Sequence, residues 1–276
     1  MLDNSTANDF SIQFWGVRDG ISTPGKDTVR YGGNTSCVEL RLGDTRLIFD
    51  AGSGLRVLGN CLLRHMPVEA HIFFSNCHWD RLQGFPFFTP AFIPINHFHL
   101  YGAATLQGES MQQRLSGQML PPNFPVPIQV MGSKLEFHAI EPEHKLLLGE
   151  ATIESTYLVR ASYRSIAYRI NWQGQSVVYA TAPHAYEEDQ ALAKLLSRAN
   201  TLVLAAPPLS DHPFEVIEDR WHSRLNLAKQ AEVKSLVFSS YSPDYDDQLL
   251  DRLEKSIQAS FPTASLAREG MVVPVI

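Results

Sequence analysis

The chain has 276 residues, of which 44 % are hydrophobic and 19 % charged, and its formal net charge is −6. This composition is ordinary for a globular protein with a sizeable core. A mildly acidic chain without a basic run argues against general nucleic-acid binding, and no apolar run has the length of a membrane span. Residues 1–10 lack the basic and apolar regions of a signal peptide. The three cysteines form no C-x-x-C pair and favour a reducing compartment, so we expect a cytoplasmic protein.

Alternating and short apolar runs predict the strands of the first half of the chain, at residues 11–15, 36–42, 45–49, 70–74 and 99–102. The second and third of these strands read as a hairpin around Gly43-Asp44. Helices are predicted at residues 55–65, with Ser53 as the N-cap, and at residues 104–119. Two Pro-rich stretches, residues 85–94 and 121–127, are predicted to be irregular because proline cannot donate a backbone hydrogen bond.

The second half repeats this order of strands followed by helices. Strands are predicted at residues 134–139, 151–159, 165–172, 176–181, 201–204, 235–239 and 270–275, and helices at 187–198, 220–230 and 247–260. Two such halves predict an α/β fold, an αββα sandwich of two mixed β-sheets flanked by helices. Without a linker, a low-complexity tract or a repeat, we expect residues 1–276 to form a single domain.

The segment Asn76-Cys77-His78-Trp79-Asp80-Arg81 resembles the H-x-H-x-D-H signature of the metallo-β-lactamase superfamily. Four further segments support the resemblance in the same order along the chain: FWGVR at 14–18, RYGGNTSC at 30–37, FDAGSG at 49–54 and QGFPFF at 83–88. Together they are similar to the branch of phosphodiesterase and RNase-Z-like hydrolases, from residue 14 to about residue 247. The resemblance implies the two-sheet sandwich, and because members often pair, it leaves a homodimer open.

The resemblance also implies where metal ligands would lie, since seven side chains of that superfamily hold two ions that activate water. Only His78 and Asp80 retain a ligand type, and they belong to different ions. The other positions carry Asn76, Arg81, about Ala161, Ala182, and Ser239 or Ser240. Arg81 puts a permanent cation where an ion would lie. The resemblance therefore implies a degenerate centre without a metal cofactor, in which His78 and Asp80 mark the former catalytic site.

We therefore expect a pseudoenzyme with a binding or regulatory role, whose partner is a small anionic ligand or another protein. The candidate ligand-binding residues are Asn76, His78, Asp80, Arg81, Arg160, His184, His222 and Ser240. If Arg81, Arg160 and Arg164 converge, their guanidinium groups would recognise phosphate or carboxylate. In the simpler interpretation, Asp80 is only an ion-paired carboxylate that fills the emptied cavity. Asp50 is expected to be structural and to bond the amides of the turn that follows it.

A metal-dependent hydrolase of phosphodiester or ester bonds is the alternative. It requires a mononuclear site for one zinc or other divalent ion, rebuilt by His78 and Asp80 with Cys77, His184 or His222. Cys77 is more simply a buried thiol that points away from the ligand face, and His222 a helix-start histidine bonded to backbone. A third, metal-free chemistry would combine Ser239 or Ser240 with His78 and Asp80, if the fold brings them together.

Overall fold

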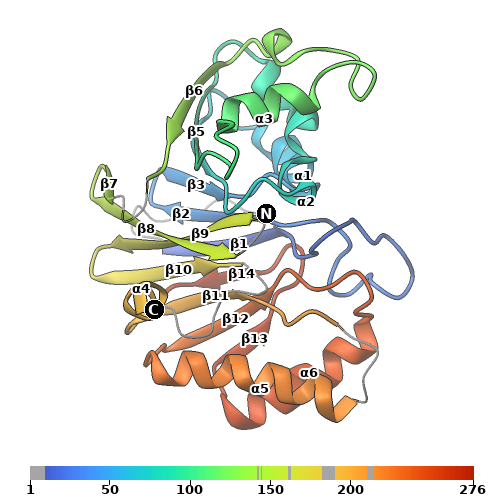
Figure 1. The fold of residues 1–276 in the computed structure, drawn as a ribbon, viewed down its shortest axis with the longest axis vertical. Helices are drawn as coiled ribbons and strands as arrows, with labels where there is room; N and C mark the ends of the chain where they lie inside the picture. The colour runs from blue at the N-terminus through green and yellow to red at the C-terminus, as the bar shows by residue number, and fades with distance from the viewer. Residues whose placement is uncertain (1–9, 142, 144, 161–162, 182–189, 210–213) are drawn as a thin grey trace.

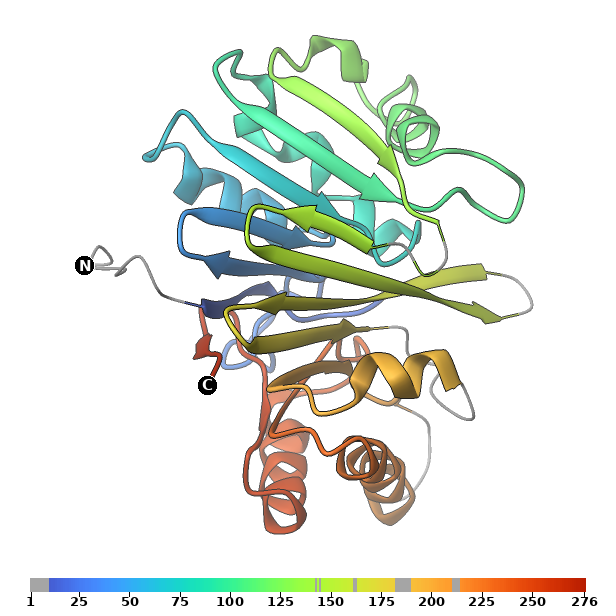
Figure 2. The ribbon, with the colours of Figure 1, turned by 90° about the vertical axis from the view of Figure 1, so that its left-hand side faces the viewer.

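Two seven-stranded β-sheets face each other in the computed structural model, which describes residues 10–141, 143, 145–160, 163–181, 190–209 and 214–276. Helices cover the outer face of each sheet, as the two views in Figure 1 and Figure 2 show. Each sheet contains both parallel and antiparallel pairs. The predicted αββα sandwich of two mixed sheets is therefore confirmed.

The first sheet is built mainly from the N-terminal half. Its strands, in spatial order, are β14 (Val272–Pro274), β1 (Phe10–Gly16), β2 (Cys37–Leu42), β3 (Thr45–Phe49), β4 (Glu69–Phe73), β5 (His97–Gly102) and β6 (Lys134–Ala139). Strands from β14 to β3 pair antiparallel and those from β3 to β6 pair parallel. Along this half lie α1 (Gly54–Leu62), α2 (Trp79–Leu82), α3 (Met111–Gln118) and the 3-10 helices η1 (Phe85–Phe87), η2 (Thr89–Phe92) and η3 (Ile128–Val130).

The second sheet has the same plan. Its strands, in spatial order, are β13 (Ala264–Leu266), β12 (Ser235–Ser239), β11 (Thr201–Ala205), β10 (Gln175–Ala180), β9 (Tyr163–Trp172), β8 (Ala151–Arg160) and β7 (Lys145–Leu148). Pairing is parallel from β13 to β10 and antiparallel from β10 to β7. Helices α4 (Gln190–Leu196), α5 (Phe214–Gln230) and α6 (Asp247–Ser260) belong to this half, and α5 and α6 lie below the sheet in Figure 1.

The largest buried cluster fills the space between the sheets and continues beneath α4, α5 and α6. At its centre the Phe49 ring lies 5.4 Å from Phe73 and 5.0 Å from Tyr179, measured between centroids. A second cluster packs Leu55 of α1 and Leu115 of α3 against the outer face of the first sheet. Burial of apolar surface on both faces of each sheet fixes the four layers, because a one-residue slip would turn every core side chain outward.

Some local details differ from the predictions: the helix predicted at residues 220–230, for example, is α5 and begins at Phe214. The helix predicted at residues 104–119 covers only Met111–Gln118, because Ser110 forms a capping box with Gln113 and Gly108 has a φ of +88°. The Ser53 hydroxyl makes no N-cap bond in α1 and instead accepts from the Thr35 amide at 2.9 Å. The short strands β7 and β13 were not predicted. None of the helices in the described ranges combines the length and apolar composition needed to cross a membrane.

Candidate functional site

Arg81, in the short helix α2, is a fully buried cation at the junction of the two sheets. Each guanidinium nitrogen faces a different carboxylate: Nε lies 2.9 Å from Asp80, Nη1 3.1 Å from Asp50 and Nη2 3.0 Å from Asp19. The Nε and Asp80 Oδ2 atoms form an ion pair but are not aligned as a hydrogen bond. Burial alone would lower the pKa of Arg81, but Asp80, Asp50 and Asp19 together raise it well above its usual value. The side chain therefore stays charged.

Asp50 is the most strongly bonded of the three carboxylates. It follows β3 directly, is fully buried, and accepts from the Ser75 amide at 2.7 Å, the Ser75 hydroxyl at 2.8 Å and the Tyr179 hydroxyl at 2.8 Å. Burial raises the pKa of Asp50, whereas Arg81, Ser75 and Tyr179 act in the opposite direction. We assign the ionised form, because four donors, one of them a permanent cation, converge on two oxygens. Asp50 thus bonds the segment after β4, and the predicted bonds to its own turn were wrong.

The ends of strands from the second sheet complete the surroundings of Arg81. Its Nη1 lies 3.3 Å from the Ser240 hydroxyl and 3.5 Å from the Thr181 hydroxyl, and these residues follow β12 and β10. The Ser240 hydroxyl also lies 3.0 Å from that of Ser36. Among the residues that the structure describes, the Ser239 hydroxyl is buried without a hydrogen-bond partner. These contacts are polar and structural, and they place no general base beside Ser240 within the described ranges.

Because the fold implies a two-metal centre, we asked whether these residues fit one, and they do not. The resemblance implies histidine ligands at the positions of Arg81 and of Ser239 or Ser240, and the Arg81 guanidinium lies within 3.1 Å of three carboxylates. Within the described ranges, no group of three metal-ligating side chains includes His78 or Asp80. Ala161, Ala182 and His184 lie outside the described residues. The same holds for the side chain of Arg160.

His78 and Asp80 face different surroundings, although they are two residues apart. The Asp80 carboxylate is buried against Arg81, whereas His78 is exposed at the start of α2 and its amide donates to Asn76 Oδ1 at 2.9 Å. His78 and Asn76 line a cavity of about 150 Å³, and Asp80 does not. Cys77 was expected to point away as a buried thiol, but it is partly exposed and lines this cavity as well. Burial raises the pKa of its thiol to about 11.

The basic side chains of this cavity are Arg164 and Arg114. Arg164, in β9, donates to the Ala104 carbonyl at 3.1 Å, and its guanidinium carbon lies 4.6 Å from the centre of the Tyr157 ring. Its Nε is buried without a hydrogen-bond partner among the described residues. Arg114 is more exposed and pairs with Glu109 at 2.9 Å. Arg81 does not line the cavity, so the structure does not show the expected convergence of Arg81 with Arg164.

His222 lies away from these residues, in the middle of the 17-residue helix α5. Its Nε2 lies 3.3 Å from the Ser256 hydroxyl of α6. Ser256 in turn donates to Glu218. His222 therefore belongs to the contact between α5 and α6, and the expectation of a helix-start histidine bonded to backbone was wrong.

Sequence reasoning missed a second group of chemically active side chains. Histidines and glutamates gather on one face of β4, β5 and β6, where Glu69, His97 and His99 form one potential metal-ligating group and His99, Glu136 and His138 form another. The signal was present in His97-Phe98-His99, because residues two apart on a strand point to the same face.

Comparison with solved structures identifies the fold. The chain superimposes on YhfI of Bacillus subtilis, a metallo-β-lactamase fold protein, with a TM-score of 0.67 and 17 % identity over 97 % of this chain and 99 % of that one. A diphosphatase of the PhnP family gives 0.69 and 15 %, covering 96 % and 97 % of the two chains. The short form of human tRNase Z gives 0.66 and 16 %, covering 96 % and 99 %. No protein-family model and no curated protein sequence matches. The chain thus has the metallo-β-lactamase fold.

Proposed function

We propose that this metallo-β-lactamase-fold chain is not a metallohydrolase and acts as a binding or regulatory protein for a small anionic ligand. The observation that carries the proposal is the Arg81 guanidinium, which is 1 % exposed and lies within 3.1 Å of the carboxylates of Asp19, Asp50 and Asp80. A built-in cation occupies the place where the fold would otherwise carry metal.

Electrostatics opposes a metal ion beside this guanidinium. A dication about 4 Å from a unit positive charge is repelled by roughly 8 kcal/mol at an effective dielectric constant of about 20. An ion would therefore have to displace Arg81 from three carboxylates, and the chain retains few side chains that could compensate. Water activation by paired ions, the chemistry that this fold commonly supports, has no ligand set at this position within the described residues.

The ligand chemistry follows from the neighbouring cavity. Its volume of about 150 Å³ suits a small anion with phosphate or carboxylate groups, such as pyrophosphate. Glu109 pairs with Arg114, so Arg164 supplies most of the unbalanced positive charge. The side chains of Asn76 and His78 add polar groups along the wall. A guanidinium with donors to spare favours a tetrahedral or planar anion.

Calorimetric titration with pyrophosphate tests this proposal, together with an assay for released phosphate. We expect binding without turnover, at least tenfold weaker in Arg164→Ala and unchanged in Arg56→Ala, because Arg56 is an exposed arginine of α1 outside the cavity. No binding by the wild type, or equal binding by the Arg164 variant, would contradict the ligand assignment. Metal-dependent release of phosphate that is lost in Asp80→Asn would instead support the hydrolase alternative.

A further inference from the structure

Six polar side chains share one face of three adjacent parallel strands. The register pairs Glu69 of β4 with His97 of β5, His71 of β4 with His99 of β5, and His99 with Glu136 of β6, while His138 lies opposite Tyr101. Phe73 lies on the same face of β4 and is fully buried in the core. At the other end of this face, the Glu69 side chain is 64 % exposed. The patch therefore lies where the inner face of the first sheet emerges into solvent.

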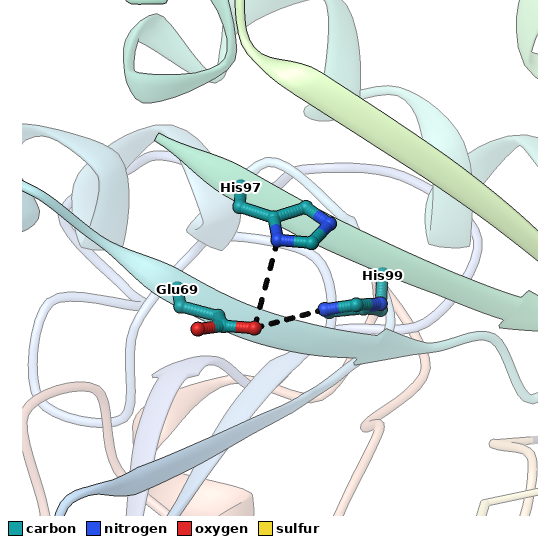
Figure 3. A group of neighbouring side chains, drawn as sticks. All are labelled: Glu69, His97 and His99. Atoms are coloured by element: carbon teal, nitrogen blue, oxygen red, sulfur yellow. Dashed lines mark hydrogen bonds and ion pairs between the residues drawn. The ribbon is translucent and has the colours of Figure 1, made fainter. Parts of the chain in front are cut away.

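Glu69, His97 and His99 point toward one another in Figure 3. Glu69 Oε1 lies 3.0 Å from His99 Nε2 and 3.6 Å from His97 Nδ1, and all three ligand atoms lie within 4.8 Å of one another. Zinc bonds of about 2.0–2.1 Å at tetrahedral angles separate neighbouring ligand atoms by about 3.3 Å. The two measured separations bracket this value, so an ion could bind with small side-chain adjustments.

We propose that Glu69, His97 and His99 form a binding site for one divalent transition-metal ion, with Zn²⁺ as the reference ion. The site is new in position, because it lies on β4 and β5 rather than around Arg81. Its ligand types are two imidazoles and one carboxylate, a combination that suits zinc and neighbouring ions of the first transition row. Three protein ligands leave a fourth position for water or an incoming ligand atom.

Glu136 supports this choice over the second group. Its two oxygens lie 3.1 Å from His99 Nδ1 and 3.5 Å from His97 Nε2, which are the ring nitrogens that face away from Glu69. A carboxylate behind a ligating histidine orients the ring and increases its basicity. Glu136 is also paired with Lys134, whose ammonium would repel an ion bound to that carboxylate directly. Glu136 thus acts as an outer partner and Glu69 as the ligand.

Neighbouring rings support the ligand histidines and leave them partly open to solvent. The His71 ring stacks on His99 with 4.6 Å between centroids and hydrogen-bonds Tyr101 at 3.2 Å. The His99 side chain is 14 % exposed and that of His97 is 25 % exposed, which leaves an ion a path from solvent.

Equilibrium dialysis of the full-length, untagged protein against ZnCl₂, followed by elemental analysis, tests the site. We expect one ion per chain in the wild type, a loss of at least tenfold in affinity in His97→Ala, His99→Ala and Glu69→Gln, and a smaller loss in Glu136→Gln. The matched control is His65→Ala, an exposed histidine outside both groups, which should bind as the wild type does. Glu69→Gln keeps the shape of an exposed side chain, so its effect does not depend on the fold of the histidine variants.

Different results would overturn the metal site on β4 and β5 and the proposed role of Arg81. No zinc binding by the wild type, or undiminished binding in His99→Ala, would overturn the site. Loss of binding in His138→Ala with full binding in His97→Ala would overturn the assignment to Glu69 and His97. Binding that is lost in Asp80→Asn and retained in His99→Ala would contradict both this site and the account of Arg81.

Discussion

Arg81 Nη1 donates to Asp50 Oδ2 across 3.1 Å, and neither side chain is more than 1 % exposed. The pair joins helix α2 to the end of β3, and Asp50 extends the connection to Ser75 and Tyr179. Further hydrogen bonds support this buried ion pair: Arg81 also donates to Asp19 and Ser240, and Asp50 also accepts from Ser75 and Tyr179. The relationship gives Arg81 a structural role at the junction of the two sheets.

Removal of the guanidinium should therefore destabilise the fold strongly. Arg81→Ala leaves three carboxylates without their cation, and breaking a buried pair from one side costs about 3–5 kcal/mol. We expect a decrease of that size in the free energy of unfolding, measured by urea denaturation at pH 7. Arg56→Ala, at an exposed position, should change it by less than about 0.5 kcal/mol. A loss below about 1 kcal/mol in Arg81→Ala would show that the ion pairs contribute little.

Arg81→Ala should also acquire an affinity for hard cations. Without Arg81, the carboxylates of Asp19, Asp50 and Asp80 lose their cation, and drawn together they would offer the all-oxygen ligands that Mn²⁺ or Ca²⁺ prefers. We expect millimolar MnCl₂ to raise the melting temperature of Arg81→Ala and to leave that of the wild type unchanged, in differential scanning fluorimetry. Adding Asp80→Asn should abolish the gain. An equal response of wild type and variant would contradict the replacement of metal by Arg81.

Tyr179 offers a milder perturbation of the same centre. Its hydroxyl donates to Asp50 at 2.8 Å, and both groups are fully buried. Tyr179→Phe removes one donor to a carboxylate without changing the ring, so we expect a loss of about 1.5–3 kcal/mol in the free energy of unfolding. Tyr157→Phe is the matched control, because the Tyr157 hydroxyl donates to the Ile140 carbonyl nearer the surface. Its loss in the free energy of unfolding should be smaller. Equal losses would indicate that Asp50 does not depend on Tyr179.

The fold was predictable because it follows from patterns that lie within short segments. Alternation at residues 36–42 and 45–49 gave the hairpin of β2 and β3, and the prediction of α6 at Asp247–Ser260 was confirmed at both ends. The resemblance of the segment from Asn76 to Arg81 also singled out Arg81, which the structure buries among three carboxylates. These inferences needed only local sequence and the order of segments.

The partners of Arg81 could not be predicted in the same way. Asp19 comes from a polar loop after β1, and Asp50 and Ser240 follow strands in different sheets, so their meeting depends on the packing of both sheets. The His and Glu patch illustrates the same limit. His97 and His99 predictably share a face, but the register that brings Glu69 and Glu136 beside them is set by three-dimensional strand pairing.

The thiol of Cys77 provides a pH-dependent probe of the cavity. Burial raises its pKa to about 11, so the reactive thiolate is scarce at pH 7, at roughly one molecule in ten thousand, and increases about tenfold per pH unit below that pKa. We expect alkylation of Cys77 by iodoacetamide in Cys61→Ser to be slow at pH 7 and to accelerate toward pH 11. Saturating pyrophosphate should slow it at every pH. Rapid modification at pH 7 would contradict the raised pKa of this thiol, and modification insensitive to pyrophosphate would contradict binding in this cavity.

The most direct test of the central claim is the metal content of the untagged double variant His97→Ala/His99→Ala, in which the patch on β4 and β5 cannot bind an ion. The protein would be incubated with Zn²⁺, Mn²⁺ or Fe²⁺, desalted and subjected to elemental analysis. We expect much less than one ion per chain in every case, because Arg81 occupies the position of the metal. One or two tightly held ions per chain, removed by Asp80→Asn, would contradict this account and show that the fold retains a working metal centre.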